Sequence, residues 1–425
     1  MQRVRMSLPY HAQNGWDVVV LAVAAKDVAA TQEPELIATV PANCRVVQCR
    51  TRRWNWLRFF GCGTLGWRAW WPLFWSGRRL LRGEHFDLVY FSNTQFLTFF
   101  LGPIWRRLYG VPYVIDIQDP WYTDAYQQPG APRPPGGWKY RIASLIAKLG
   151  EGPTYRRAAG FTSVSPRYFA ELSRRYSWFS NQPQAHIPFG VAPGDLQLAR
   201  RSSIVVPVLR QTPDEIVLLY TGAAGPIIPR AANLLFAGLA RLRQRTPSAI
   251  RRLRLHFIGT SYVEKGRGRP QLLPLAASHG VDDLVREVPH RIGQLASLRV
   301  LDQADALLLL GSTDPAYSPS KTYAYWLSRK PILQVALRGS YLAELSAHMG
   351  GCHEVFFDDS ASSIDTTTDD IAAALEQLTT GGGLPPTRPR NAPWFAEHCL
   401  AENLTRRQCA LFDACLAPTP NRAAH

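Results

Sequence analysis

The chain has 425 residues, 46% hydrophobic and 19% charged, which supplies apolar side chains for the cores of two or three globular domains. No apolar run reaches the roughly 18–20 residues of a membrane-spanning helix, and Met1–Gln13 lack the apolar stretch of a signal peptide. We therefore expect a cytoplasmic protein, either soluble or peripheral to a membrane.

The net charge of +16 is unevenly distributed, since the stretch Arg45–Arg82 holds nine arginines and no acidic residue. Such a field attracts polyanions, including anionic phospholipids, lipid phosphates and nucleic acids. A solvated basic face is the simpler alternative, and a general preference for arginine over lysine contributes to the charge. The seven cysteines form no C-x-x-C pair and are odd in number, so we expect neither a zinc site nor a disulfide framework.

Short β-type runs alternate with longer helical patterns along the whole chain. In the first half they predict strands at 17–23, 45–49, 87–91, 112–117, 160–164 and 185–188. In the second half they predict strands at 216–221, 253–259, 285–288, 306–310, 331–335 and 354–357. Several runs, such as 18–23 and 306–310, are continuously apolar, which is typical of parallel strands covered on both faces. Twelve such strands fit two doubly wound sheets of about six strands each.

The expected domains are an N-terminal Rossmann-like domain over 1–195, a second one over 196–392, and a C-terminal helix with a frayed tail over 393–425. The Pro- and Gly-rich segment Gln127–Gly137 is expected to be a loop. Residue 1 begins in what looks like a first helix, so we expect the first strand of this domain to be missing or to lie upstream. A sheet without that central strand leaves ladder groups unpaired.

The segment Ala316–Pro331 follows an apolar strand and a loop, and it predicts a helix that begins near Ser320, whose hydroxyl can cap it. A helix N-terminus offers free backbone N–H groups and the positive end of the dipole. Lys321 adds a full charge that opposes this dipole, so helix stability alone gives no reason for it. The pattern favours a diphosphate cradle, and a solvated lysine on an ordinary helix is the alternative.

This segment, Ser318-Pro-Ser-Lys-Thr-Tyr-Ala-Tyr325 followed by Lys330-Pro331, resembles the donor-site signature of family 4-type (group 1) GT-B glycosyltransferases. Further segments are similar to that family in order and spacing over about residues 8–345: Gly15–Val18, His85–Ser92, Asp116–Trp121, Gly160–Ser165, Ile187–Gly190, Tyr220–Gly222 and Leu255–Gly259. The resemblance implies an α/β fold of the GT-B type, with two Rossmann-like doubly wound domains facing across a cleft.

The resemblance also implies a reaction, the transfer of a sugar from a nucleotide-diphosphate donor to a polysaccharide or lipid-linked acceptor, with retention of anomeric configuration. The donor would bind the C-terminal domain, and the expected donor-binding residues are Gly222, Ala223, Gly225, Ser320, Lys321, Asp314 and His290. Fixed hydrogen-bond donors and Lys321 would stabilise the charge of the leaving diphosphate. We expect no cofactor and no metal, because no acidic D-x-D motif is present.

Asp119 is the expected catalytic acid, because it ends an apolar strand at the edge where α/β sheets place their sites. Its carboxylate would orient the acceptor hydroxyl or the donor sugar, and a turn or N-cap aspartate before Pro120 is the alternative. Asp116, Ser92 and Trp121 are expected on the same acceptor side. Trp121 would stack on a sugar face or serve as packing.

The two glutamates that the family usually carries in the donor region align with Ala316 and Ala324. Neither alanine side chain accepts a hydrogen bond, and each lost contact to a substrate hydroxyl costs on the order of 1–3 kcal/mol. Asp314 lies two residues from the first position and is a substitute there. The alternative function is therefore a catalytically degenerate GT-B protein that acts as a partner or scaffold in glycan assembly.

Arginine and tryptophan alternate through Arg52–Trp75, which holds six of the 13 tryptophans. This composition suits an anionic membrane interface, where tryptophan lies at headgroup depth. A helix packed on the N-terminal sheet is the alternative. Nucleic acid is not an expected partner, because no known nucleic-acid fold surrounds the segment. We expect peripheral contact with the inner face of a membrane.

Overall fold

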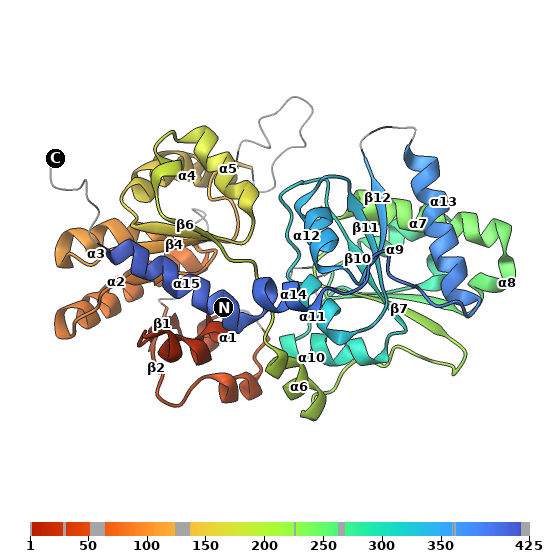
Figure 1. The fold of residues 1–425 in the computed structure, drawn as a ribbon, viewed down its shortest axis with the longest axis horizontal. Helices are drawn as coiled ribbons and strands as arrows, with labels where there is room; N and C mark the ends of the chain where they lie inside the picture. The colour runs from red at the N-terminus through yellow and green to blue at the C-terminus, as the bar shows by residue number, and fades with distance from the viewer. Residues whose placement is uncertain are drawn as a thin grey trace. The chain divides into compact units, whose positions relative to one another are not determined.

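The computed structural model describes residues 2–28, 31–51, 64–123, 137–224, 227–261, 268–358, 360 and 363–417 (Figure 1). The chain divides into two compact units. The N-terminal unit comprises residues 1–30, 40–188 and 401–425, and the C-terminal unit comprises residues 31–39 and 189–400. The boundary at 188/189 thus precedes the expected limit at 195/196. Residues 31–39 and 401–425 each belong to the unit other than the one expected from their place in the sequence.

The C-terminal unit contains one parallel sheet of six strands in the order β12-β11-β10-β7-β8-β9. The strands are β7 (Ile216–Thr221), β8 (Leu253–Ile258), β9 (Val285–Val288), β10 (Ala306–Leu310), β11 (Ile332–Leu337) and β12 (His353–Phe357). Each overlaps a strand predicted from its apolar run, and together they form the doubly wound sheet that was expected. The strand order reverses between β7 and β10, which is the switch point where sheets of this type bind ligands.

Helices cover both faces of this sheet. They are α6 (Pro193–Arg201), α7 (Pro229–Arg245), α8 (Pro247–Ile250), α9 (Leu272–Ser278), α10 (Gln294–Arg299), α11 (Lys321–Ser328), α12 (Tyr341–Met349), α13 (Ser363–Thr379) and α14 (Ala392–Cys399). Successive strand residues point to opposite faces, so Leu218 joins the core under α7 and α13, and Leu219 joins the core under α10 and α12. Both leucines are fully buried.

The segment 31–39, expected in the first domain, belongs to the C-terminal unit for an electrostatic reason. The Glu33 carboxylate accepts backbone N–H groups at the start of α10, from Gln294 at 2.5 Å, Leu295 at 2.8 Å and Ala296 at 3.2 Å. A carboxylate is stabilised by the unpaired N–H groups and the positive dipole end of a helix. Leu36 adds a buried apolar contact in the same unit.

The N-terminal unit contains two parallel sheets, β1-β2 and β3-β4-β5-β6, instead of the single sheet of about six strands that was expected. The strands are β1 (Val19–Val23), β2 (Arg45–Cys49), β3 (Val89–Phe91), β4 (Tyr113–Ile117), β5 (Gly160–Ser163) and β6 (Gln184–His186). Among the described residues no strand pairs with β1 on its other side or with the free edge of β3. Every residue of β1 is consequently only half-buried, whereas β4 is buried throughout as its apolar sequence predicted.

The helices of this unit are α1 (Gln2–His11), α2 (Leu65–Gly83), α3 (Leu101–Tyr109), α4 (Trp138–Arg156), α5 (Pro166–Arg175) and α15 (Ala401–Leu416). The single helix expected over 393–416 is wrong, because Leu400 is extended and separates α14 from α15. Phe412 of α15 packs edge-on against both Trp16 and Tyr90, with ring centroids 5.2 and 5.1 Å away. These contacts hold α15 in the N-terminal unit.

Candidate functional site

Lys321 is the first residue of α11, at the switch point of the C-terminal sheet. Its Nζ is inaccessible to solvent, has no hydrogen-bond partner, and lies 3.4 Å from the centroid of the Tyr220 ring. Its Cε and Nζ are 3.2 Å from the position that a Cβ of residue 222 would take, so Gly222 makes room for this ammonium. A desolvated ammonium without a polar partner is costly unless an anion completes its surroundings.

Burial lowers the pKa of Lys321 well below its usual 10.5, and the positive charge of Arg291 lowers it further. Arg291 follows β9, and its side chain is exposed. The predicted site residues did not include it, because its effect depends on the sheet bringing the ends of β9 and β10 to one edge. Two basic side chains at one sheet edge make that edge electropositive.

Backbone hydrogen bonds join the loops that follow β7, β8 and β9. Gly222 N–H donates to Ile258 O at 2.8 Å, and Gly259 N–H donates to Val288 O at 2.8 Å. Gly259 has a positive φ of 77°, and a Cβ there would lie 3.7 Å from Arg291 Cα. Gly222 has a φ of 109°, which L side chains rarely adopt. These glycines bring the strand ends together around Lys321.

Two contacts fix the position of α11. The Tyr325 hydroxyl accepts the backbone N–H of Thr221 at 2.8 Å, which ties the helix to the end of β7. The Trp326 indole donates to the carbonyl oxygens of Met349 and Gly350 at 3.1 and 3.0 Å. The helix that carries Lys321 is therefore held from both sides by buried aromatic side chains.

The structure describes four of the other predicted donor residues, with different outcomes. Ser320 precedes α11, but its hydroxyl forms no cap, because its backbone is helical (φ −59°, ψ −25°) and not extended as capping requires. The exposed Asp314 carboxylate accepts the N–H of Ala316 at 2.8 Å within its own loop. Ala223 accepts a hydrogen bond from the Tyr220 hydroxyl at 2.6 Å through its carbonyl oxygen. His290 is half-buried, and Gly225 lies outside the described residues.

On the N-terminal unit, Asp116 is fully buried and is the centre of a polar network. Its carboxylate forms an ion pair with Arg3 at 3.0 Å and accepts hydrogen bonds from Ser92, Gln118 and Thr162, each at 2.7 Å. Arg3 is also buried. Ser92 and Asp116, both expected on the acceptor side, are thus brought together at the ends of β3 and β4. The sequence did not indicate Arg3.

Asp119 follows β4 by two residues, and its side chain reaches solvent. Desolvation by the surrounding protein raises the pKa of the Asp119 carboxyl to about 6. Trp121 is only 8% exposed, and it packs against Phe96, Phe99 and Phe100 with ring centroids 5.2 to 6.1 Å away. The structure therefore places Trp121 mainly in an aromatic core.

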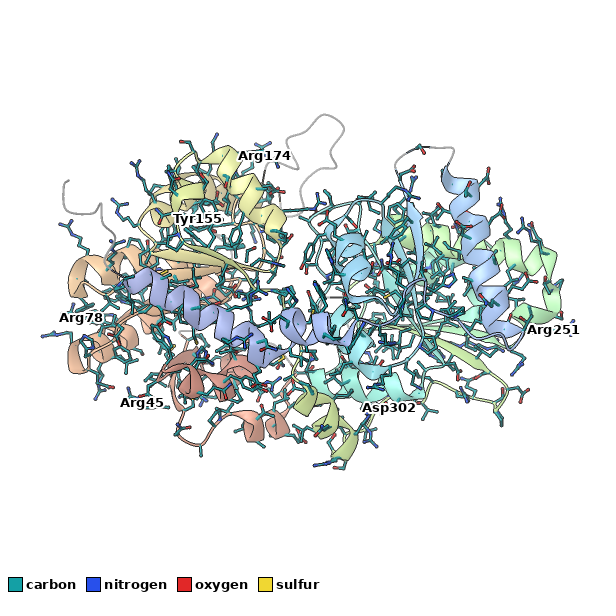
Figure 2. All side chains as sticks on the ribbon, in the orientation of Figure 1. Arg45, Arg78, Tyr155, Arg174, Arg251 and Asp302 are labelled. Carbon is teal, nitrogen blue, oxygen red and sulfur yellow. The ribbon has the colours of Figure 1, made fainter. Side chains whose placement is uncertain are left out.

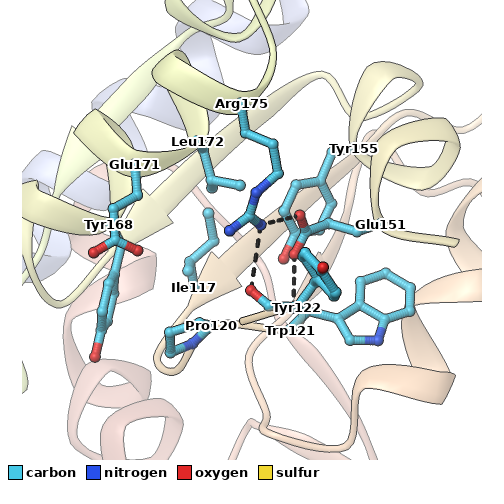
Figure 3. Close-up of a pocket in the computed structure, with 10 residues that line it drawn as sticks. All are labelled: Ile117, Pro120, Trp121, Tyr122, Glu151, Tyr155, Tyr168, Glu171, Leu172 and Arg175. Carbon is cyan, nitrogen blue, oxygen red and sulfur yellow. Dashed lines mark hydrogen bonds and ion pairs between the residues drawn. The ribbon is translucent and has the colours of Figure 1, made fainter. Parts of the chain in front are cut away.

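A small pocket opens beside Trp121, between the end of β4 and the helices α4 and α5 (Figure 3). Buried Glu151 forms an ion pair with Arg175 at 2.6 Å and accepts the Tyr122 N–H at 2.9 Å. Arg175 also donates to Tyr122 O at 3.2 Å. The sequence did not indicate this pair, since its members lie 24 residues apart on different helices.

Within the described part of the chain, no group of three or more His, Cys, Asp or Glu side chains is arranged to hold a metal ion. Ala316, at the first family glutamate position, is buried, whereas Ala324 at the second position is half-buried.

Figure 2 shows Arg78 and Arg174 at the periphery of the N-terminal unit and Tyr155 inside it.

Comparison with known proteins gives a fold for the chain and a family match for its N-terminal part. Residues 2–190 match the family described as glycosyl transferase 4-like domain. A UDP-forming α,α-trehalose-phosphate synthase from Burkholderia xenovorans, solved with glucose-6-phosphate, is 10% identical with a TM-score of 0.56. The alignment covers 98% of this chain and 94% of that one.

A structure from E. coli, described as trehalose-6-phosphate bound with UDP-2-fluoro glucose, is 10% identical with a TM-score of 0.54, covering 95% of this chain and 100% of that one. At this identity the similarity shows the fold alone. No curated protein matches the chain. The chain therefore has the α/β GT-B fold, and its residues 2–190 match the glycosyl transferase 4-like domain.

Proposed function

We propose that this protein transfers a sugar from a nucleoside-diphosphate donor bound at the C-terminal edge of the second sheet. The observation that carries the proposal is Lys321, a buried ammonium without a hydrogen-bond partner at the switch point. A diphosphate oxygen would supply the missing anionic partner. The related GT-B structures, solved with UDP-2-fluoro glucose or from a UDP-forming enzyme, support this choice of ligand class.

In the proposed complex, Lys321 and Arg291 hold the diphosphate, and Gly222 lets the backbone approach it closely. His290 borders the nucleotide base, and Asp314 and the backbone around Ala223 and Gly225 complete the donor side. As the bond between the anomeric carbon and the diphosphate oxygen breaks, the leaving group gains negative charge. The two fixed cations stabilise that charge in the transition state, so no metal ion is needed.

The acceptor binds the N-terminal unit, where Asp119 orients its hydroxyl group. Transfer forms a bond between the anomeric carbon and the acceptor oxygen with retention of configuration, as the bond to the diphosphate oxygen breaks. The acceptor hydroxyl gives its proton to the leaving diphosphate. Asp116 and Ser92 act behind Asp119, because their polar network fixes the ends of β3 and β4. Trp121 supports the loop that carries Asp119.

We further propose that the acceptor is lipid-linked or a growing polysaccharide, met at the inner face of a membrane. Of the predicted membrane contact Arg52–Trp75, the structure describes residues 64–75. In this part, the α2 side chains of Trp67, Trp71 and Trp75 are 39, 49 and 58% exposed. They follow one another at four-residue spacing, so they share one face of the helix. Tryptophan on such a face inserts at headgroup depth.

A degenerate GT-B protein that serves as a partner in glycan assembly is the second candidate, and Ala316 and Ala324 favour it. Restoring the second glutamate distinguishes the two functions. Ala324 is half-buried, so an Ala324→Glu side chain can extend toward solvent, where a bound nucleotide would offer a ribose hydroxyl. If the chain is an active transferase, this variant should bind the donor more tightly, by a factor of about 10 to 150 for one added hydrogen bond to a charged group.

The direct test is nucleoside-diphosphate release from a panel of UDP-, GDP- and ADP-sugars in the presence of a lipid and glycan extract. An active transferase releases one diphosphate in an acceptor-dependent manner, and Lys321→Met abolishes the release. Absence of release from every donor, by a folded protein that still binds a nucleotide, would support the partner function. Absence of both would contradict the donor site itself.

A further inference from the structure

A second helix of the N-terminal unit, α4, exposes a row of large apolar side chains that its fold does not use. Trp138, Ile142, Leu145 and Leu149 are 50, 46, 54 and 66% exposed. At about 100° per residue, their spacing of four, three and four residues places all of them within an arc of about 60°. Scattered exposed apolar residues are ordinary, but a continuous row of four marks an interaction surface.

The opposite face of α4 makes its contacts with the rest of the unit. Ala147, Gly150 and Glu151 are buried there, and Glu151 pairs with Arg175. A Cβ on Gly150 would overlap the Phe100 ring, so the helix is seated closely on this side. The exposed row therefore follows from the orientation of a well-fixed helix.

Basic side chains border the row on both sides. At the same 100° per residue, Arg141 and Lys148 lie on one flank and Lys139 lies on the other. All three are exposed. Neither Arg141 nor Lys148 takes part in an ion pair with the described acidic residues. The only acidic residue in the sequence of α4 is the buried Glu151.

An apolar stripe bordered by cations suits one partner best, the surface of an anionic lipid bilayer. The apolar side chains would enter the boundary between headgroups and acyl chains, and the cations would contact lipid phosphates. None of the described helices is long and apolar enough to cross a membrane. A helix lying in the interface needs no such length.

We propose that α4 is an interfacial helix that binds anionic lipid through Trp138, Ile142, Leu145 and Leu149. This surface is separate from the α2 tryptophans, and it extends the membrane contact of the proposed function to a second helix. Both helices pack on the same element, the turn Phe96–Phe100 and the residue before it. Gly66 N–H of α2 donates to Gln95 at 2.9 Å, and Gly150 of α4 lies against Phe100.

Co-sedimentation of the full chain with vesicles tests the inference. Vesicles of phosphatidylcholine with about one third phosphatidylglycerol are compared with pure phosphatidylcholine vesicles. We expect binding to the anionic vesicles only, weakened by salt. The double variant Leu145→Glu/Leu149→Glu should bind at least about tenfold more weakly, because two apolar side chains become anionic. Arg141→Gln/Lys148→Gln should weaken binding by about five- to thirtyfold, at roughly 1 kcal/mol per cation.

The matched control is Val205→Glu/Val208→Glu, which makes the same kind of exchange at two residues of the C-terminal unit that are 93 and 80% exposed. It should bind vesicles like the parent chain. Because all four exchanged positions are exposed, both double variants should keep the parental melting temperature and the parental nucleotide affinity. That affinity reports on the donor site independently of lipid.

Three results would overturn the inference. In the first, Leu145→Glu/Leu149→Glu binds vesicles as tightly as the parent chain, whereas Trp71→Ala/Trp75→Ala no longer binds them. This result would leave α2 as the sole membrane contact. Another is an absence of vesicle binding by the parent chain. The third is a parent chain that dimerises, fails to bind vesicles, and becomes monomeric on the α4 exchange, which would assign the stripe to a second copy of the chain.

Discussion

Replacing Lys321 by methionine should change stability and ligand binding in opposite directions. Methionine keeps the length of the side chain and removes the buried charge, which has no hydrogen-bond partner in the free protein. Relief of an unsatisfied buried polar group is worth about 1–3 kcal/mol. Loss of the contact with the Tyr220 ring costs about 0.5–2 kcal/mol.

The free energy of unfolding should therefore rise by about 1 kcal/mol in Lys321→Met. In a domain of this size that corresponds to an increase in melting temperature of about 2–4 °C. Affinity for a nucleoside diphosphate should fall by about 10- to 150-fold, because a hydrogen bond to a charged group is worth about 1.5–3 kcal/mol. Thermal unfolding and calorimetric titration measure the two effects on the same preparation.

The pH dependence of the free energy of unfolding tests the sign of the Lys321 contribution independently. The folded-state pKa of Lys321 is lowered below 10.5, so the unfolded chain binds more protons between the two pKa values. Stability conferred by this group therefore rises with pH across that window, and Lys321→Met should flatten the rise. Diphosphate binding favours the charged ammonium, so it should be accompanied by proton uptake in the parent chain and not in the variant.

Lys330→Met is the control, because Lys330 lies just beyond the same helix and donates to the carbonyl oxygens of Asp302 and Ala304 at 3.1 and 2.7 Å. Its replacement should lower stability and leave nucleotide affinity unchanged. If Lys321→Met were destabilised like Lys330→Met, and if it bound nucleotides at the parental affinity, our interpretation of the buried ammonium would be refuted.

Gly222→Ala should weaken nucleotide binding, measured by calorimetry, at least about tenfold, because φ at this residue is 109° and the new Cβ would press on Lys321. The control is Gly280→Ala, at a positive φ outside the site, which should lower stability without changing nucleotide affinity. Asp119→Asn should remove an inflection near pH 6 from the pH profile of transfer, where protonation of the carboxylate lowers the parental rate; a profile that keeps the inflection would assign it to another group. Asp116→Asn should lower the free energy of unfolding by about 3–5 kcal/mol in denaturant titration, because it leaves the Arg3 guanidinium buried without its ion pair, and a loss below about 1 kcal/mol would contradict that role.

The sequence predicted the secondary structure of the sheets well, because continuous apolar runs such as Ala306–Leu310 define buried parallel strands locally. It did not predict the separation of β1 and β2 from the other strands of their unit. Pairing depends on which strand edges meet, and an apolar run such as Val19–Val23 contains no information about its neighbours. The same limit explains the helix break at Leu400 and the capture of Glu33 by α10.

Of the expected site residues, Lys321 was singled out because a lysine opposes the dipole at a helix start, and Gly222 was taken from the family resemblance. The structure places the two side by side, with Lys321 Nζ 3.2 Å from the position of a Cβ at residue 222. The position of Arg291 beside Lys321, the burial of Arg3 and the Glu151–Arg175 pair were not predicted, because the partners of these residues are distant in sequence. The expected cap by Ser320 failed because the backbone at that residue is already helical.

Calorimetric titration of the full chain with UDP, GDP and ADP, with and without magnesium, tests the central claim most directly. We predict micromolar binding of one nucleotide without magnesium, and its loss in Lys321→Met. Absence of binding by all three nucleotides to a folded, monodisperse protein would contradict a working donor site.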